Sequence, residues 1–268
     1  DPAVAALIAG LGSPGWTVRR DATAALKARG RAAIAPLEAR LTDPDPEVAW
    51  RAEEILAVLK KGLWLETGLD ATRRKAWPKA RDDLKKAART AGTAAPKIHD
   101  LADAVGTAFL GGSDDPLERA LAKHRICIFF WARKEAPPDL LADEAGKDYA
   151  EILRRADAPD GSPDERRAAR LGRVALLAET GDKKGARAEM RLQRETLSTV
   201  ADHLAAAYAR ASLGEKDAAL REIVAAAREN PMDVLLYLRR TSDFYRIEKD
   251  AEFQRILRLL KRSGEPEE

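Results

Sequence analysis

The sequence predicts an all-α fold: an α-solenoid, in which antiparallel helical hairpins stack into a right-handed superhelix. Two internal repeats indicate this, one of period 30 near the N-terminus and one of period 33 near the C-terminus. Repeats of such length are typical of helical pairs that bury their apolar faces only by stacking on neighbours. Composition agrees, since aromatic residues make up only 5% of the chain and the apolar residues are mostly Ala and Leu. Small Ala side chains let helices approach closely.

The N-terminal repeat becomes visible when Pro14 is aligned with Pro44. Each unit then begins with a polar residue and a proline, which suit the first turn of a helix. The apolar stripe of the second unit consists of Val48, Ala52, Ile55, Leu56 and Leu59. This spacing is that of one face of a helix. Between the two units, residues 31–41 follow Gly30, a natural helix stop, and are expected to form the partner helix.

This region resembles the HEAT-repeat family, in particular the short bacterial form with a D-P-x-V-R-x-x-A-x-x-x-L helix. The second unit has the matching Asp45-Pro46-Glu47-Val48, and the first unit keeps Val18-Arg19. The second unit departs from the family at Ala49, where an Arg is usual. The resemblance implies that residues 1–62 form HEAT-like helical pairs.

The C-terminal repeat places Gly181-Asp182-Lys183 33 residues before Gly214-Glu215-Lys216. The second copy continues as an Ala-rich helix that ends at Pro231, and this resembles the second helix of a tetratricopeptide (TPR) repeat. The first helix of that repeat is then expected at about residues 201–212. The resemblance implies that residues 161–268 form TPR-like hairpins.

The end of the chain is similar to the closing segment of bacterial TPR arrays. Asp243-Phe244 is followed by residues 247–257 with the spacing of that segment. We expect four apolar residues to cover the end of the stack, namely Phe244, Phe253, Ile256 and Leu257.

Residues 63–160 match no repeat but read as helices throughout. Trp77-Pro78 is expected to break a helix, because proline lacks the N–H that a helix interior requires. A helix is predicted from Pro116 to about Lys134, and its apolar run at residues 126–131 is expected to be buried between the two repeat regions. The turn residues at 157–163 place a boundary near residue 160.

Charge, cysteine content and the length of apolar runs limit the partners, cross-links and membrane segments that the chain is expected to have. The net charge of +3, from 47 basic and 44 acidic residues, gives no global reason to expect a polyanionic partner. The single cysteine, Cys127, excludes an intramolecular disulfide, and no apolar run reaches the ~20 residues of a membrane span. The first residue is Asp1, which fits a processed or trimmed chain, so the compartment stays open between the cytoplasm and export after removal of a signal peptide.

The fold class favours a non-enzymatic scaffold that binds an unidentified protein partner on its concave surface, without a cofactor or a metal. The candidate contacts on the TPR-like helix are His203, Tyr208 and Arg210. Trp50 is either an exposed contact or a plug packed against residues 63–160, and we expect the plug. The oligomeric state stays open.

One rival hypothesis is nucleic-acid binding by a HEAT-like protein, since residues 73–89 hold eight basic side chains, two acidic ones and Trp77. The candidate contacts would be Arg74, Lys75, Arg81, Lys85 and Arg89. Basic runs are more often solvated faces of amphipathic helices, which we favour here.

A second rival is an enzyme of the lyase or glycosylase type. It predicts a concave pocket with an acid beside an aromatic ring, and it would lose support if Trp50, Trp64 and Trp77 all packed in the interior. His124 and Cys127 lie three residues apart on one predicted helix, but no second pair completes a metal site, so we expect both in the core.

Overall fold

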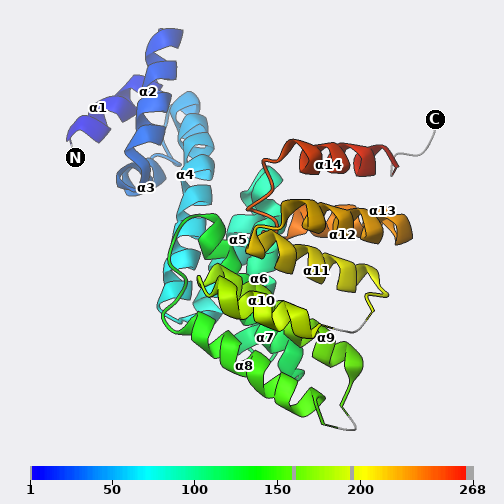
Figure 1. Cartoon of the computed structure of the whole chain (residues 1–268). Helices are drawn as coiled ribbons and strands as arrows, with labels where there is room; N and C mark the ends of the chain where they lie inside the picture. The colour runs from blue at the N-terminus through cyan, green and yellow to red at the C-terminus, as the bar shows by residue number, and fades with distance from the viewer. Residues whose placement is uncertain (1, 159–160, 194–195, 264–268) are drawn as a thin grey trace.

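The structure, a computed structural model, describes residues 2–158, 161–193 and 196–263. Within these ranges every regular element is a helix, which confirms the all-α prediction (Figure 1). The helices are α1 (Pro2–Leu11), α2 (Trp16–Arg29), α3 (Ile34–Glu38), α4 (Pro46–Arg73), α5 (Trp77–Thr90), α6 (Ala95–Phe109), α7 (Pro116–Ala132), α8 (Leu141–Ala156), α9 (Pro163–Glu179), α10 (Lys183–Leu192), α11 (Val200–Leu213), α12 (Lys216–Glu229), α13 (Pro231–Arg240) and α14 (Ala251–Ser263). Two 3-10 turns lie at Gly30–Ala33 and Gly92–Ala94.

Helices α1 to α4 form the N-terminal end of the molecule around a small apolar core. The predicted stripe of α4 is buried there except for the half-buried Leu59, and Val4, Ile8 and Leu11 of α1 pack against it. Residues 31–41 do not form one helix: the 3-10 turn leads into the short helix α3. Pro36 lies in the first turn of α3, where its missing N–H is tolerated, and it disfavours an α-helix that begins several residues earlier.

Helix α4 is a single helix of 28 residues that joins the N-terminal end to the middle of the molecule. The expected boundary between residues 62 and 63 therefore falls inside a helix. Apolar residues continue beyond it, and Leu69 enters the next core. Gly62 is exposed and disfavours a helix by an amount that a long helix tolerates.

Helices α4, α5, α6 and α7 pack in sequence order around a second core. The expected break at Trp77-Pro78 is confirmed, since α4 ends at Arg73 and α5 begins at Trp77. The Trp77 ring stacks on Phe109 of α6, with the ring centroids 3.9 Å apart. The apolar run at residues 126–131 of α7 is buried except for the half-buried Trp131, also as expected.

The C-terminal half continues with α8 to α14 (Figure 1). Two hairpins, α9–α10 and α11–α12, follow one another, and the first helix of each is followed by a glycine of the 33-residue repeat. Gly181 and Gly214 have φ values of +99° and +83°, which glycine adopts without strain. Ile128 of α7 shares one core with α9 and α11, so the packing is continuous across residue 160.

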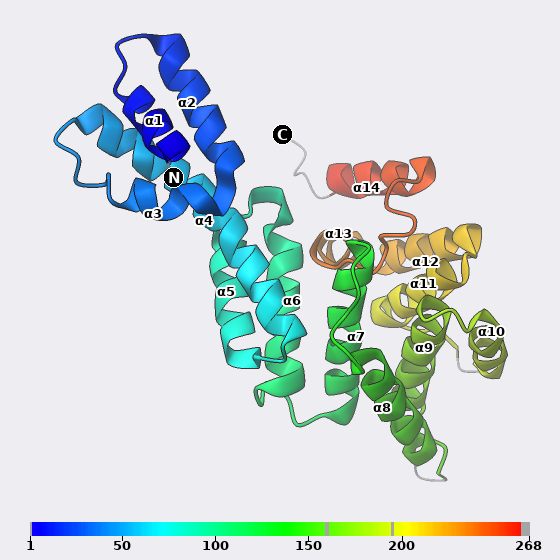
Figure 2. The ribbon, with the colours of Figure 1, turned by 90° about the vertical axis from the view of Figure 1, so that its left-hand side faces the viewer.

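The closing segment packs as predicted. Phe244, Phe253 and Ile256 are buried, the half-buried Leu257 lies against the same core, and α14 contacts α12 and α13. Helix α13 also contacts α6 in the middle of the chain (Figure 2). Arg240 at the end of α13 pairs with Asp103 of α6 at 2.7 Å. This pair holds α13 beside α6, and residues of α7 and α13 line a pocket.

Candidate functional site

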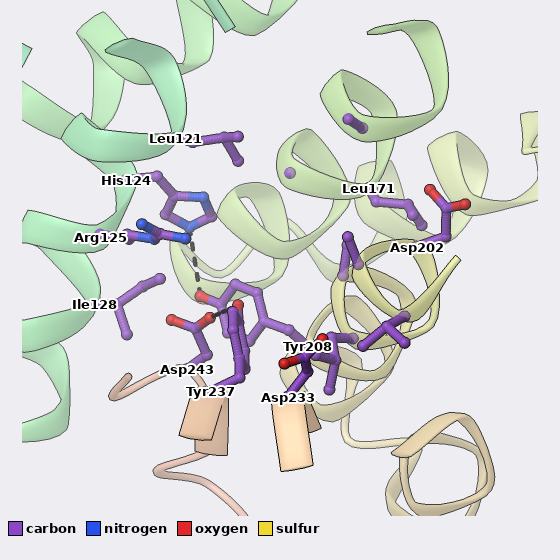
Figure 3. Close-up of a pocket in the computed structure, with 16 residues that line it drawn as sticks. Leu121, His124, Arg125, Ile128, Leu171, Asp202, Tyr208, Asp233, Tyr237 and Asp243 are labelled. Atoms are coloured by element: carbon purple, nitrogen blue, oxygen red, sulfur yellow. Dashed lines mark hydrogen bonds between the residues drawn. The ribbon is translucent and has the colours of Figure 1, made fainter. Parts of the chain in front are cut away.

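A pocket with a volume of about 420 Å³ lies between α7, α9, α11 and α13 (Figure 3). Helix α7 supplies Leu121, His124, Arg125 and Ile128, which share one face because they are three or four residues apart. Leu171 comes from α9 and Leu204 from α11. Such a volume is typical of sites for small ligands or anchoring side chains.

His124 is fully buried at the inner end of the pocket. Its Nδ1 lies 3.3 Å from the Tyr149 hydroxyl, and its Nε2 lies 3.4 Å from the Tyr208 hydroxyl. Burial and the neighbouring Arg125 cation lower the pKa of His124 to about 3. The imidazole is therefore neutral at physiological pH and connects the two tyrosines, so the core position expected for His124 is confirmed.

Arg125 and Asp243 are the charged groups of this inner end (Figure 3). Asp243 is 5% exposed and accepts a hydrogen bond from the Tyr237 hydroxyl of α13. Burial raises the pKa of Asp243, although Arg125 and the Tyr237 bond counteract it. The pocket thus has a buried carboxyl, two tyrosine hydroxyls and a guanidinium at one end, and apolar walls along its length.

A second carboxyl, Asp100 of α6, lies on the far side of Arg125. Its Oδ1 is 3.9 Å from Nη1 of Arg125 and 3.6 Å from Nε of Arg240. Burial outweighs both cations and raises the pKa of Asp100 to about 6. The protonation of Asp100 therefore changes near pH 6.

The mouth of the pocket is held by a buried ion pair between α9 and α11. Nε of Arg167 lies 2.7 Å from Oδ1 of Asp202, and both side chains are about nine-tenths buried. Asp202 also closes a capping box with Thr199 at the start of α11. Desolvation of Asp202 is outweighed by its bonds to Arg167 and to Ser198 and Thr199, which lower its pKa. The pair fixes the spacing of α9 and α11.

The structure separates the residues expected to contact a partner. Tyr208 lies inside the pocket and is only 6% exposed, so it is not on an open concave surface. His203 and Arg210, on another face of α11, instead lie against Glu222 of α12, with closest distances of 2.9 and 3.4 Å. They join the two helices of one hairpin.

The expectation that Trp50 is a plug is wrong, since its side chain is 55% exposed. Trp50 is two residues after Val48 on α4, about 200° around the helix, so it points away from the core that Val48 enters. The Arg51 guanidinium lies over its ring at 5.5 Å. The alternative, an exposed partner contact, stays a prediction.

Two of the five basic residues of the nucleic-acid hypothesis have acidic partners. Arg74 pairs with Asp70 at 2.9 Å, and Lys75 lies 3.3 Å from Glu144 of α8. The half-buried Arg81 side chain lies against Gly106 of α6, while Lys85 is half-buried and Arg89 is exposed. The excess of positive charge on this face is therefore smaller than the sequence suggests.

Among the described residues, no group of three or more His, Cys, Asp or Glu side chains could hold a metal ion. Cys127 is buried, and burial raises the pKa of its thiol to about 12. No helix among the residues that the structure describes has the length and apolar character needed to cross a membrane.

Sequence reasoning missed Arg125, Tyr237 and Asp243. The only signal in the sequence is that Arg125 interrupts the apolar face of α7 between Leu121 and Ile128. Comparison of the chain with protein-family models, with curated proteins and with solved structures gave no match.

Proposed function

We propose that this protein is a helical-repeat binding protein that accepts a short segment of a partner protein in the pocket between α7, α9, α11 and α13. The observation that carries the proposal is the pocket itself, in which apolar walls lead to a buried polar end. This combination is typical of sites that bury an apolar group and fix its orientation by a few hydrogen bonds.

The proposal includes the repeat architecture. Helices α1 to α4 would hold the HEAT-like units, and α9–α10 and α11–α12 would be the TPR-like units of one α-solenoid. In support, each helix from α4 to α9 packs on the next along the chain. Such arrays bind partners on the surface formed by the first helices of successive hairpins, and α9 and α11 hold that position here.

The test is selection of a library of random dodecapeptides displayed on phage against the purified chain. Ala201 is exposed at the pocket mouth, and Ala201→Trp should obstruct the entrance without disturbing the core. We expect enriched peptides that bind the wild-type chain about tenfold or more tightly than the Ala201→Trp variant.

The matched control is Ala57→Trp, at an exposed position of α4 that does not line the pocket. Selected peptides should bind this variant as they bind the wild-type chain. The proposal is wrong if no peptide is enriched, or if Ala201→Trp and Ala57→Trp bind the enriched peptides equally well.

A second candidate function is acid–base catalysis, because Asp243 beside Tyr237 is an acid next to an aromatic ring in a concave pocket. A carboxyl with a raised pKa, as at Asp243, is suited to donate a proton. The test is hydrolysis of a panel of chromogenic glycosides and esters. Turnover that is present in the wild-type chain and lost in Asp243→Asn would favour this candidate; no turnover of any substrate would remove it.

A further inference from the structure

The inner end of the pocket presents a guanidinium without hydrogen-bond acceptors. Arg125 has five N–H donors, and none of them makes a hydrogen bond with the described residues; the nearest carboxylate, that of Asp100, is 3.9 Å away. About 40% of its side-chain surface is accessible. The guanidinium faces the pocket beside His124 and Tyr208 (Figure 3). These donors are therefore available to a bound molecule.

An acceptor lies at the same end. Oδ2 of Asp243 accepts a hydrogen bond from the Tyr237 hydroxyl, whereas Oδ1 receives none from the residues that the structure describes. Asp243 lines the pocket with Arg125 (Figure 3). A ligand that reaches this end meets donors on one side and an acceptor on the other.

The charges of the inner end nearly cancel. Arg125 offsets Asp243, Arg240 lies 3.6 Å from Asp100, and the His124 imidazole is neutral. An anion would be placed near two carboxyls, and a cation would be placed near Arg125. Both would lose their hydration with little net Coulombic gain, so an uncharged group is favoured. An amide is uncharged, and it offers both an acceptor C=O and a donor N–H.

The walls determine what accompanies the amide. Leu121, Ile128, Leu171 and Leu204 line the cavity of about 420 Å³, so the body of the ligand must be apolar. A capped apolar residue of a peptide has both properties, since its side chain is apolar and its main chain consists of amides.

We infer that the pocket recognises an uncharged apolar residue of a partner segment. Its main-chain carbonyl accepts hydrogen bonds from the Arg125 guanidinium, and its main-chain N–H donates to Asp243. The inference rests on the proposed function. It adds the chemistry of the bound residue and the two side chains, Arg125 and Asp243, that hydrogen-bond to it.

The test is calorimetric titration with three forms of one dipeptide: acetyl-Leu-Phe-amide, which is uncharged; acetyl-Leu-Phe, which carries a carboxylate; and Leu-Phe-amide, which carries an ammonium. We expect the uncharged form to bind about tenfold or more tightly than either charged form, because each charged form would bury one uncompensated charge.

Two variants test the donor. Arg125→Met should weaken binding of the uncharged form about tenfold, since hydrogen bonds to a charged group are lost. Arg125→Lys keeps the positive charge between Asp100 and Asp243, so this variant is expected to fold. It should also bind the uncharged dipeptide more weakly, because Lys lacks the paired N–H donors of the guanidinium. Arg133→Met, in the exposed turn after α7, is the control and should bind as the wild-type chain does.

Tighter binding of the carboxylate or ammonium form would overturn the inference, as would unchanged binding by folded Arg125→Lys and Arg125→Met. Selected phage peptides that need an open pocket, together with no binding of the uncharged dipeptide, would leave the proposed function standing and reject the inference. Absence of both kinds of binding would reject both.

Discussion

At the scale of single residues, the contact between Gly172 and Tyr149 shows how tightly the helices beside the pocket pack. A Cβ atom added at Gly172 of α9 would lie 2.6 Å from Cζ of Tyr149, whose ring is completely buried and whose hydroxyl is hydrogen-bonded to His124. At Gly146 of α8 the nearest atom would be Leu176 Cδ2 at 3.5 Å, an ordinary contact. Two helix-interior glycines thus differ only in the space around them.

We expect Gly172→Ala to lower the free energy of unfolding by about 1–3 kcal/mol, because the Tyr149 ring cannot move aside. The matched control, Gly146→Ala, should raise it by about 0.5–1 kcal/mol through the higher helix propensity of Ala. Urea denaturation of both variants measures the effect. If both changes stabilise the protein, the Tyr149 ring does not pack against Gly172 as described.

The protonation of Asp100 gives a pH dependence of stability. Its pKa is about 6 in the folded protein and near 4 in an unfolded chain, so between these values the folded state binds more protons. The free energy of unfolding should therefore fall as the pH rises from 4 to 6, and this group contributes up to about 3 kcal/mol of that fall. Asp100→Asn should remove this part of the slope in urea denaturation at stepped pH. Parallel curves for the two proteins would contradict the assignment.

At the scale of helices, the sequence predicted which segments are helical better than it predicted where each helix ends. The break before α5 and the position of α7 followed from prolines, glycines and apolar spacing, which act locally, and the position of α11 followed from the repeat resemblance. The length of α4 did not follow, because the repeat resemblance suggested an end near residue 62 where the apolar pattern continues. The orientation of Trp50 could have been derived from its 200° offset from Val48.

The continuity of α4 at Gly62 is testable. The glycine is exposed and a Cβ there would meet nothing within 4 Å. Gly62→Ala should therefore stabilise the protein by about 0.5–1 kcal/mol, and Gly62→Pro should destabilise it by about 3 kcal/mol, since proline interrupts the helix. Thermal denaturation compares the two variants. If Gly62→Pro left the stability unchanged, α4 would consist of two separate helices that meet near residue 62.

The connection between α9 and α11 depends on the buried pair of Arg167 and Asp202. Arg167→Met would leave the Asp202 carboxylate buried without its cation, at a cost of about 3–5 kcal/mol. Arg154→Met removes the partner of Glu151 on the exposed face of α8 and should leave stability nearly unchanged. Equal effects of the two changes in urea denaturation would mean that the Arg167 pair is as solvated as the exposed one.

At the scale of the whole molecule, the pocket arises from contacts between distant parts of the chain, and this is why the sequence did not predict it. Asp100, Arg125 and Asp243 come from three segments that meet only because α13 packs on α6. Repeat patterns describe neighbouring helices, and they carry no information about a contact across 137 residues such as that of Arg240 with Asp103. Candidates chosen from α11 alone therefore included one pocket residue, Tyr208, together with two hairpin residues.

The central claim is that a partner segment binds in the pocket between α7, α9, α11 and α13. Its most direct test is amide hydrogen exchange of the wild-type chain with and without a selected peptide. We predict slower exchange in α11 and α13 and in the adjoining turns of α7, because a bound segment stabilises the elements that enclose it. Protection confined to α1–α4, around the exposed Trp50, with unchanged exchange in α11 and α13, would contradict the claim.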